Sequence, residues 1–168
     1  MSFVQFFVPG IPQPHGSKTV NRHTGSMYDT NKKLMPWRTD MIGCAHQAMT
    51  SQSRSQFLGP VRVQLIAVFP RPKSHYGTGR NADLLKDSAP SFHCQKPDAD
   101  KLARAVLDAL TIAGVWRDDA QASFVSIQKN WGGGTYTPGM SIFVQDAIGD
   151  DVPLPRHQRP IETMETLL

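Results

Sequence analysis

The sequence KPDADKLARAVLDALTIAGVWRDDAQ, residues 96–121, carries the clearest structural pattern in the chain. Its apolar side chains recur at i, i+4, i+7, i+8 and i+11, a spacing that places them along one side of a helix. These side chains are Leu102, Val106, Ala109, Leu110 and Ala113. Gly114 suits the position just past a helix end, where a left-handed backbone is common. The pattern therefore predicts an amphipathic helix over residues 98–113.

On either side of this helix, apolar periodicity predicts four strands and one further helix. Strands are expected over residues 3–8, 61–69, 124–129 and 140–144, and the other helix is expected to start near Pro36. Two stretches rich in Gly, Pro and polar residues, 9–35 and 70–97, are predicted to be long loops. The order strand, helix, strand, helix, strand, strand indicates an α+β domain. We expect a small mixed sheet that carries both main helices on one face.

The length of 168 residues fits one domain with a hydrophobic core. We expect this domain to span residues 1–146, and residues 147–168, which mix prolines and acids without periodicity, to form an acidic, mobile tail. No apolar run approaches the roughly 20 residues that cross a membrane. Two widely spaced cysteines, Cys44 and Cys94, are typical of a reducing compartment. A cytoplasmic protein without a membrane partner is therefore expected.

Positive charge concentrates in the two predicted loops, although the net charge of the chain is only +4. A compact body with two basic loops suits a polyanionic partner such as DNA, and solvated loops without a ligand would give the same pattern. The candidate DNA-binding residues are Lys18, Arg22, Lys32, Lys33, Arg71, Lys73, Arg80 and Lys96.

Two pairs of acids flank the predicted helix. Asp98 and Asp100 stand at its start, and Asp118 and Asp119 follow at the entry to a strand. A helix of about 16 residues is about 24 Å long, so the strand must return along the helix for the pairs to meet. Carboxylates that meet repel one another unless a cation lies between them, and oxygen ligands favour a hard divalent ion.

Such a site can hydrolyse phosphodiesters, because the metal activates a water and neutralises charge on the phosphate. Lys101 and Arg104 are nearby cations that can contact the phosphate.

Each acid also has a purely structural interpretation. Asp98 is a good N-cap residue, and Asp118 and Asp119 suit a turn. Asp108 lies four residues after Arg104, the spacing of an ion pair on one helix face. Because neighbouring residues of a strand point to opposite faces, only one of Asp118 and Asp119 should face a metal. Spacing does not choose between them.

The same segments resemble the RusA family of Holliday junction resolvases, crossover junction endodeoxyribonucleases mostly encoded by phages and prophages. The motifs that match are Asp98-Ala-Asp100-Lys101-Leu102-Ala-Arg104, Asp108-Ala-Leu110, Ala113-Gly114-Val115-Trp116 and Asp118-Asp119-Ala120-Gln121. The remainder of the chain agrees more loosely, through Gly16-Ser17-Lys18 and Trp37-Arg38.

The resemblance implies a homodimer with a RusA-like fold that resolves four-way junctions by paired nicks. It also implies Mg²⁺, with Mn²⁺ as a substitute, and no nucleotide cofactor. The catalytic and metal-binding acids that it implies are Asp98, Asp100 and Asp119, and the family's catalytic cation falls at Arg104. Lys101 stands where the family usually has Asn, and Arg104 where it usually has Lys. Lys101 would then either replace the catalytic cation or bind phosphate.

Three functions remain open at this point. The first is a Mg²⁺-dependent endodeoxyribonuclease that resolves Holliday junctions. The second is a non-catalytic DNA-binding module of the same fold, and the third is a nuclease that acts more broadly on flaps or forks. The retained acids favour a nuclease, because clustered carboxylates without a metal would repel DNA.

Overall fold

The computed structural model describes residues 2–16, 18–20, 22–29, 31–133 and 137–147. The helices are α1 (Leu34–Ser51) and α2 (Ala99–Ile112), and the strands are β1 (Phe3–Pro9), β2 (Lys18–Val20), β3 (Met27–Asp29), β4 (Val61–Phe69), β5 (Ala122–Trp131) and β6 (Gly139–Asp146). Short 3-10 turns cover Lys73–His75, Gly79–Asn81 and Asp119–Gln121. The tail predicted for residues 147–168 lies outside the described residues except for Ala147, so the domain boundary stays a prediction.

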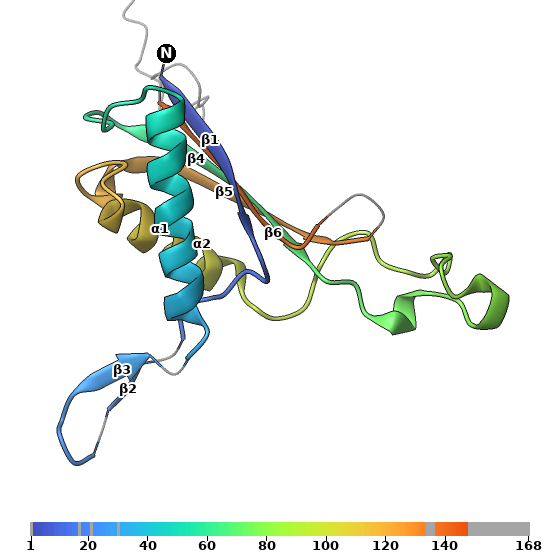
Figure 1. Ribbon diagram of the computed structural model, residues 1–168. Coiled ribbons are helices and arrows are strands. Elements are labelled where there is room, and N and C mark those ends of the chain that lie inside the picture. Colours follow the sequence, from blue (N-terminus) through green and yellow to red (C-terminus); the bar gives the residue numbers. More distant parts are fainter. Residues whose placement is uncertain (1, 17, 21, 30, 134–136, 148–168) are drawn as a thin grey trace, which may run out of the picture.

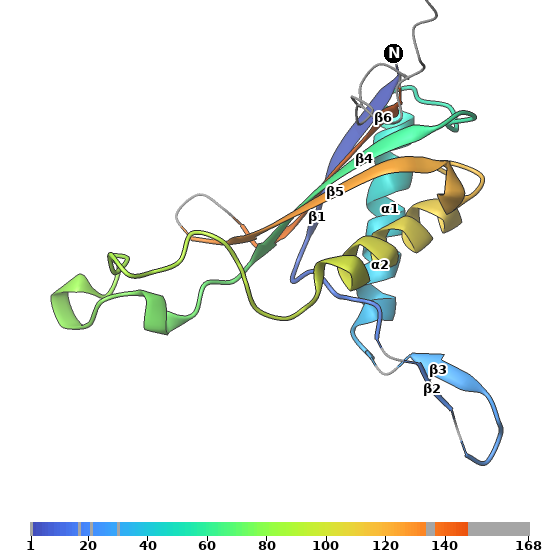
Figure 2. The same ribbon diagram turned by 180° about the vertical axis from the view of Figure 1, so that it is seen from behind.

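Four of the strands form one mixed sheet in the order β1-β6-β4-β5. Strand β6 runs antiparallel to β1 and β4, whereas β4 and β5 are parallel. Parallel neighbours need a crossover connection, which residues 70–121 provide through α2. Both helices lie against the same face of the sheet (Figure 1, and from behind in Figure 2). The predicted α+β class with two helices on one face of a mixed sheet is confirmed.

The core lies between this sheet and the two helices. On β4, alternate residues Val63, Leu65 and Ala67 have no exposed surface, and they join the buried stripe of α2 in one cluster. All five residues predicted for that stripe are buried, which confirms the helical period. Trp37 of α1 and Trp116 after α2 are 5% and 1% exposed, so both complete the core.

The end of α2 is fixed by local hydrogen bonds. Gly114 has φ +69°, the left-handed conformation expected just past a helix end. The backbone N–H of Val115 then donates to the carbonyl of Leu110 at 3.0 Å. Next along the chain, the indole N–H of Trp116 donates to Oγ1 of Thr111 at 2.7 Å. These bonds hold the path from the helix to the acidic pair that follows.

The two predicted loops contain more structure than expected. Residues 9–35 include the hairpin of β2 and β3, in which Thr19 pairs with Tyr28. Strands of three residues are too short to show alternation, so periodicity does not reveal them. Residues 70–97 form an arm with two 3-10 turns. The hairpin and the arm project from the body in different directions (Figures 1 and 2). Among the described residues, no helix is long and apolar enough to span a membrane.

The central position of β4 gives a stability prediction. Leu65→Ala should lower the free energy of unfolding by about 2–5 kcal/mol, because it removes buried methyl groups and leaves a cavity. The matched control is Gln64→Ala, an exposed neighbour on the same strand, which should change it by less than about 0.5 kcal/mol. Urea denaturation monitored by circular dichroism measures the free energy of unfolding of both variants. Equal losses in the two variants would contradict the assignment of the core face.

Candidate active site

The first pair of candidate acids lies where α2 begins. Asp98 occupies the N-cap position, yet its carboxylate accepts no capping hydrogen bond from the described residues. Its Oδ2 lies 3.5 Å from Nζ of Lys101, and the two side chains are 53% and 45% exposed. Asp100 in the first helical turn is exposed as well. The capping interpretation therefore explains the position of Asp98 but not its side chain, which remains accessible to a ligand.

Both acids of the second pair are exposed, and they differ in their hydrogen bonds. Oδ1 of Asp118 accepts a hydrogen bond from the backbone N–H of Ala120 at 2.8 Å, as one half of a capping box. The other half is Gln121, whose Oε1 accepts from the backbone N–H of Asp118 at 3.3 Å. Its Nε2 donates to the carbonyl of Phe57 at 3.1 Å. Asp119 is exposed beside this box, so the local structure favours Asp119 as the acid available for chemistry.

The two pairs do not meet within one chain. Helix α2 has 14 residues, so its ends are about 21 Å apart, with Asp98 before one end and Asp119 beyond the other. Strand β5 does return along α2, but the acids precede it, so its far end approaches Asp98 instead. There Nζ of Lys129 donates to the carbonyls of Gln95 and Pro97, each at 2.7 Å. In the part of the chain that the structure describes, no three His, Cys, Asp or Glu side chains form a metal-binding group.

Asp108 links three parts of the chain. Its Oδ2 accepts a hydrogen bond from Nε2 of His15 at 2.6 Å and lies 3.9 Å from an Nη atom of Arg38. Nε2 of His15 also lies 3.1 Å from Nη2 of Arg38, so the three side chains form one polar cluster. The predicted ion pair with Arg104 is not formed among the described residues, and Arg104 is exposed. Arg38 and Asp108 also line a hollow together with Asp119.

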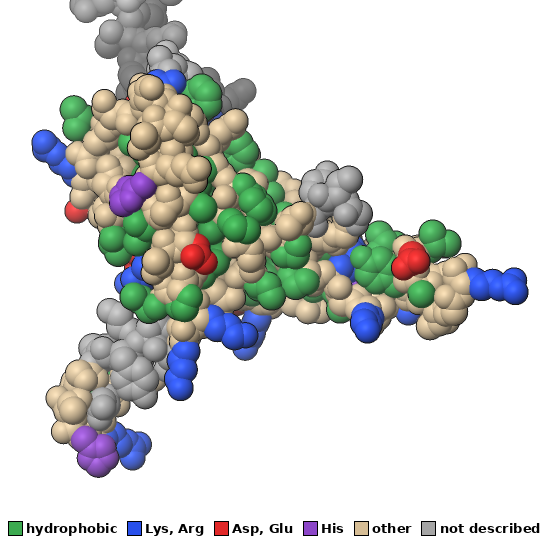
Figure 3. All heavy atoms as spheres, viewed as in Figure 1, with side chains coloured by type: hydrophobic (Ala, Val, Ile, Leu, Met, Phe, Trp, Pro, Cys, Tyr) green, Lys and Arg blue, Asp and Glu red, His purple; other side chains and the backbone are tan. Residues whose placement is uncertain are grey.

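The predicted DNA-binding residues lie mainly on exposed positions. Figure 3 shows Lys and Arg side chains along the lower margin of this face, from the hairpin to the tip of the arm. Arg71 differs, because its guanidinium donates to the carbonyls of Gly132 at 3.0 Å and Pro90 at 2.9 Å and so holds the arm. Lys18 lies in β2, and its side chain is outside the described set. The exposed residues are Arg22, Lys32, Lys33, Lys73, Arg80 and Lys96.

Two residues near Asp98 were not predicted from the sequence, Lys129 and His93. The ring of His93 is 5% exposed and lies beside the rings of Phe69 and Trp131. Burial, reinforced by the positive charge of Lys129, lowers the pKa of His93, so its imidazole is neutral at neutral pH. The only sign of this cluster in the sequence is that Phe69 and Trp131 are aromatic residues near the ends of two predicted strands. In the structure, the register of β4 and β5 pairs them with each other.

Residues 9–145 match the protein family described as "Endodeoxyribonuclease RusA". The matched range runs from the end of β1 almost to the end of β6, and so includes the hairpin, the arm and both pairs of acids. No curated protein matches the chain.

The unequal roles of the second acid pair can be tested by stability. Asp118→Ala should lower the free energy of unfolding by about 1 kcal/mol, since it removes the acceptor of the capping box. Asp119→Ala, the control at the adjacent exposed position, should change it by less than about 0.5 kcal/mol. The midpoint of urea denaturation reports both values. A larger loss for Asp119→Ala would show that the two assignments are reversed.

Proposed function

Because the chain belongs to the RusA family of endodeoxyribonucleases, we propose that it resolves four-way DNA junctions by paired hydrolysis of phosphodiester bonds, with Mg²⁺ as cofactor and Mn²⁺ as a substitute. The observation that carries this proposal is the exposed pair Asp98 and Asp100 at the start of α2, beside the ammonium of Lys101. Acids on a surface that must approach phosphates are unfavourable unless a cation neutralises them. Asp98, Asp100 and Lys101 together suit a site that binds a metal ion and a phosphate side by side.

The donor atoms fit a hard divalent cation. Asp98 and Asp100 offer only carboxylate oxygens, and Mg²⁺ is commonly held by one or two carboxylates together with waters. We assign Asp98, Asp100 and Asp119 as the residues that would hold it. When bound, the cation would neutralise charge on the scissile phosphate and lower the pKa of a water.

The cations near these acids would position the phosphate. Lys101 pairs with Asp98 at 3.5 Å, and this contact orients the carboxylate until DNA arrives. Arg104 lies one turn further along α2 and is exposed, so its guanidinium can approach a phosphate with two parallel hydrogen bonds. Lys96 is exposed just before the helix. We assign the role of transition-state cation to Lys101 or Arg104, and backbone binding to Lys96.

A homodimer would bring the separated acids together. Strand β5 is an edge strand, and Phe124 and Val125 on it are 38% and 37% exposed. An unpaired edge is a template for a strand of another chain. Antiparallel pairing of two copies of β5 about a two-fold axis would also set the neighbouring copies of α2 antiparallel. Asp119 of one copy would then approach Asp98 and Asp100 of the other, and each dimer would hold two equivalent sites.

Two sites related by two-fold symmetry suit a four-way junction, which has approximate two-fold symmetry itself. The exposed basic residues of the hairpin and the arm would hold the phosphate backbones, with an affinity that falls steeply with salt. Cys44 and Cys94 are both free thiols, in keeping with the cytoplasm of a bacterium or a phage-infected cell as the place of action.

The catalytic assignment predicts a loss of cutting without a loss of binding. Asp100→Asn should slow cleavage of a labelled four-way junction in Mg²⁺ by at least about a hundredfold, because stabilisation of charge by a metal is worth several kcal/mol. Asp40→Asn, the same substitution at an exposed acid of α1, is the control and should leave the rate unchanged. Cleavage is measured on denaturing gels, and binding by mobility shift in Ca²⁺. Full cutting by Asp100→Asn would rule out the proposed site.

The shared site makes a separate prediction, which a mixture of two inactive variants tests. A heterodimer of Asp100→Asn with Asp119→Asn would carry one site with both changes and one intact site if each site takes Asp119 from the other chain. Co-expressed variants with different affinity tags should therefore regain single nicks, whereas each homodimer alone stays inactive. If all three acids came from the same chain, both sites of the heterodimer would be broken and no nick would appear.

A further inference from the structure

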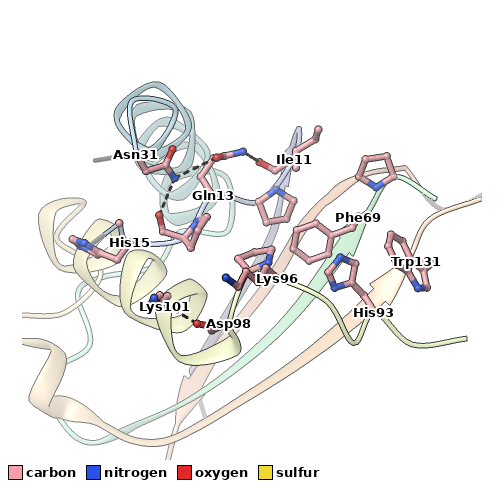
Figure 4. Close-up of a pocket in the computed structure, with 15 residues that line it drawn as sticks. Ile11, Gln13, His15, Asn31, Phe69, His93, Lys96, Asp98, Lys101 and Trp131 are labelled. Atoms are coloured by element: carbon pink, nitrogen blue, oxygen red, sulfur yellow. Dashed lines mark hydrogen bonds and ion pairs between the residues drawn. The ribbon is translucent and has the colours of Figure 1, made fainter. Parts of the chain in front are cut away.

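A cavity of about 590 Å³ lies beside Asp98, between the base of the hairpin and the base of the arm. Figure 4 shows residues from four segments around it: Ile11 after β1, Phe69 at the end of β4, His93 in the arm and Trp131 at the end of β5. Its volume is within the usual range for a small-ligand site. The catalytic assignment uses only Asp98 and the cations at its rim, so the interior has no role in it.

The interior walls are flat and aromatic. The ring centroid of His93 is 4.1 Å from that of Phe69, with planes 30° apart, and 4.2 Å from that of Trp131, with planes 50° apart. All three side chains are less than 10% exposed, so they form a fixed platform. Ile11 at the mouth is 50% exposed. Rigid aromatic surface with an apolar entrance suits a planar ring.

Two polar atoms in these walls lack partners. Nδ1 of His93 and Nε1 of Trp131 are buried, and neither has a hydrogen-bond partner among the described residues. Buried polar groups are nearly always hydrogen-bonded, so a ligand that supplies partners is expected. The indole N–H can only donate, and a neutral imidazole offers one donor and one acceptor. These groups match the mixed donors and acceptors on the edge of a nucleobase.

The rim adds charge that suits the backbone of the same ligand. Lys96 and Lys101 line the cavity next to Asp98, and both ammonium groups are on exposed side chains. The aromatic, apolar interior would therefore hold the base of a nucleotide, and the cationic rim would hold its phosphate. We propose that the cavity binds one unstacked nucleobase of the branched DNA, next to the phosphate that lies at Asp98. This inference rests on the proposed function, and a branch point is where a base leaves its stack at least cost.

Photocross-linking tests the proposal directly. Four-way junctions would carry 5-iododeoxyuridine at one position at a time around the crossover, bound to full-length protein with Asp100→Asn to prevent cutting. We expect one position to cross-link to Phe69, His93 or Trp131, as located by mass spectrometry. Ile11→Trp, which fills the mouth from a half-exposed position, should abolish that cross-link. His75→Phe is the matched control. The ring centroid of His75 lies 5.1 Å from that of Trp131, but His75 does not line the cavity, so this variant should keep the cross-link.

A second variant tests the hydrogen bonds with cutting as the readout. His93→Phe keeps an aromatic ring but removes both nitrogens. The ratio of cleavage rates between the best and the worst base at the cross-linked position should therefore fall by about two- to tenfold, which corresponds to the loss of one hydrogen bond. His75→Phe should leave this preference unchanged.

The outcomes separate the two proposals. Cross-links that map only to exposed aromatic residues of the arm, such as Phe92, or that persist in Ile11→Trp, would overturn the base pocket while junction cutting still stands. An unchanged preference in His93→Phe would overturn it as well. A protein that neither binds nor cuts junctions would overturn the proposed function and the pocket together.

Discussion

An α-helix cannot fold back on itself, and α2 is held straight by its backbone bonds and by the buried stripe on its inner side. The helix therefore acts as a spacer of fixed length. Asp98 precedes its first residue and Asp119 follows its last, so the length of the helix, about 21 Å, separates the segments that carry the two acids. Under the proposed function, chemistry that uses both acids takes one of them from a second chain. The quaternary structure is thus part of the catalytic hypothesis, and the edge strand β5 becomes as relevant as the acids.

The segments that surround the start of α2 are fastened to it from far along the sequence. His15 reaches Asp108 across 93 positions, and Lys129 reaches the carbonyl of Pro97 across 32. Arg71 ties the arm to Gly132. These bonds fix the bases of both basic projections relative to the acids. Under the proposed function, DNA held by the hairpin and the arm would therefore meet Asp98 in a defined position.

The sequence was sufficient for what depends on local periodicity. The buried stripe of α2, its end at Gly114 and the burial of Trp37 and Trp116 all follow from spacing, because one helix face or one strand face determines them. The hairpin was missed because three-residue strands carry no period. The partner of Asp108 could not be predicted because helical spacing indicates Arg104. The contact with His15 depends on tertiary packing, which spacing does not show.

The candidate site was predictable in its residues but not in its assembly. The acids at the two ends of α2 stand out in the sequence, and so does the strand that returns along it. Strand β5 does return along α2, and it brings its last residues, near Lys129, to the start of the helix. His93 was not predicted, because a lone histidine in a polar loop gives no sign that two aromatic strand ends will enclose it.

The separation of the acids also bears on how a cell tolerates such an enzyme. At low abundance the concentration of a dimer rises with the square of the concentration of its chains. A nuclease whose sites are split between two chains would thus be harmless as a newly made polypeptide. Its activity per chain would rise with the concentration of the chain until the dimer predominates.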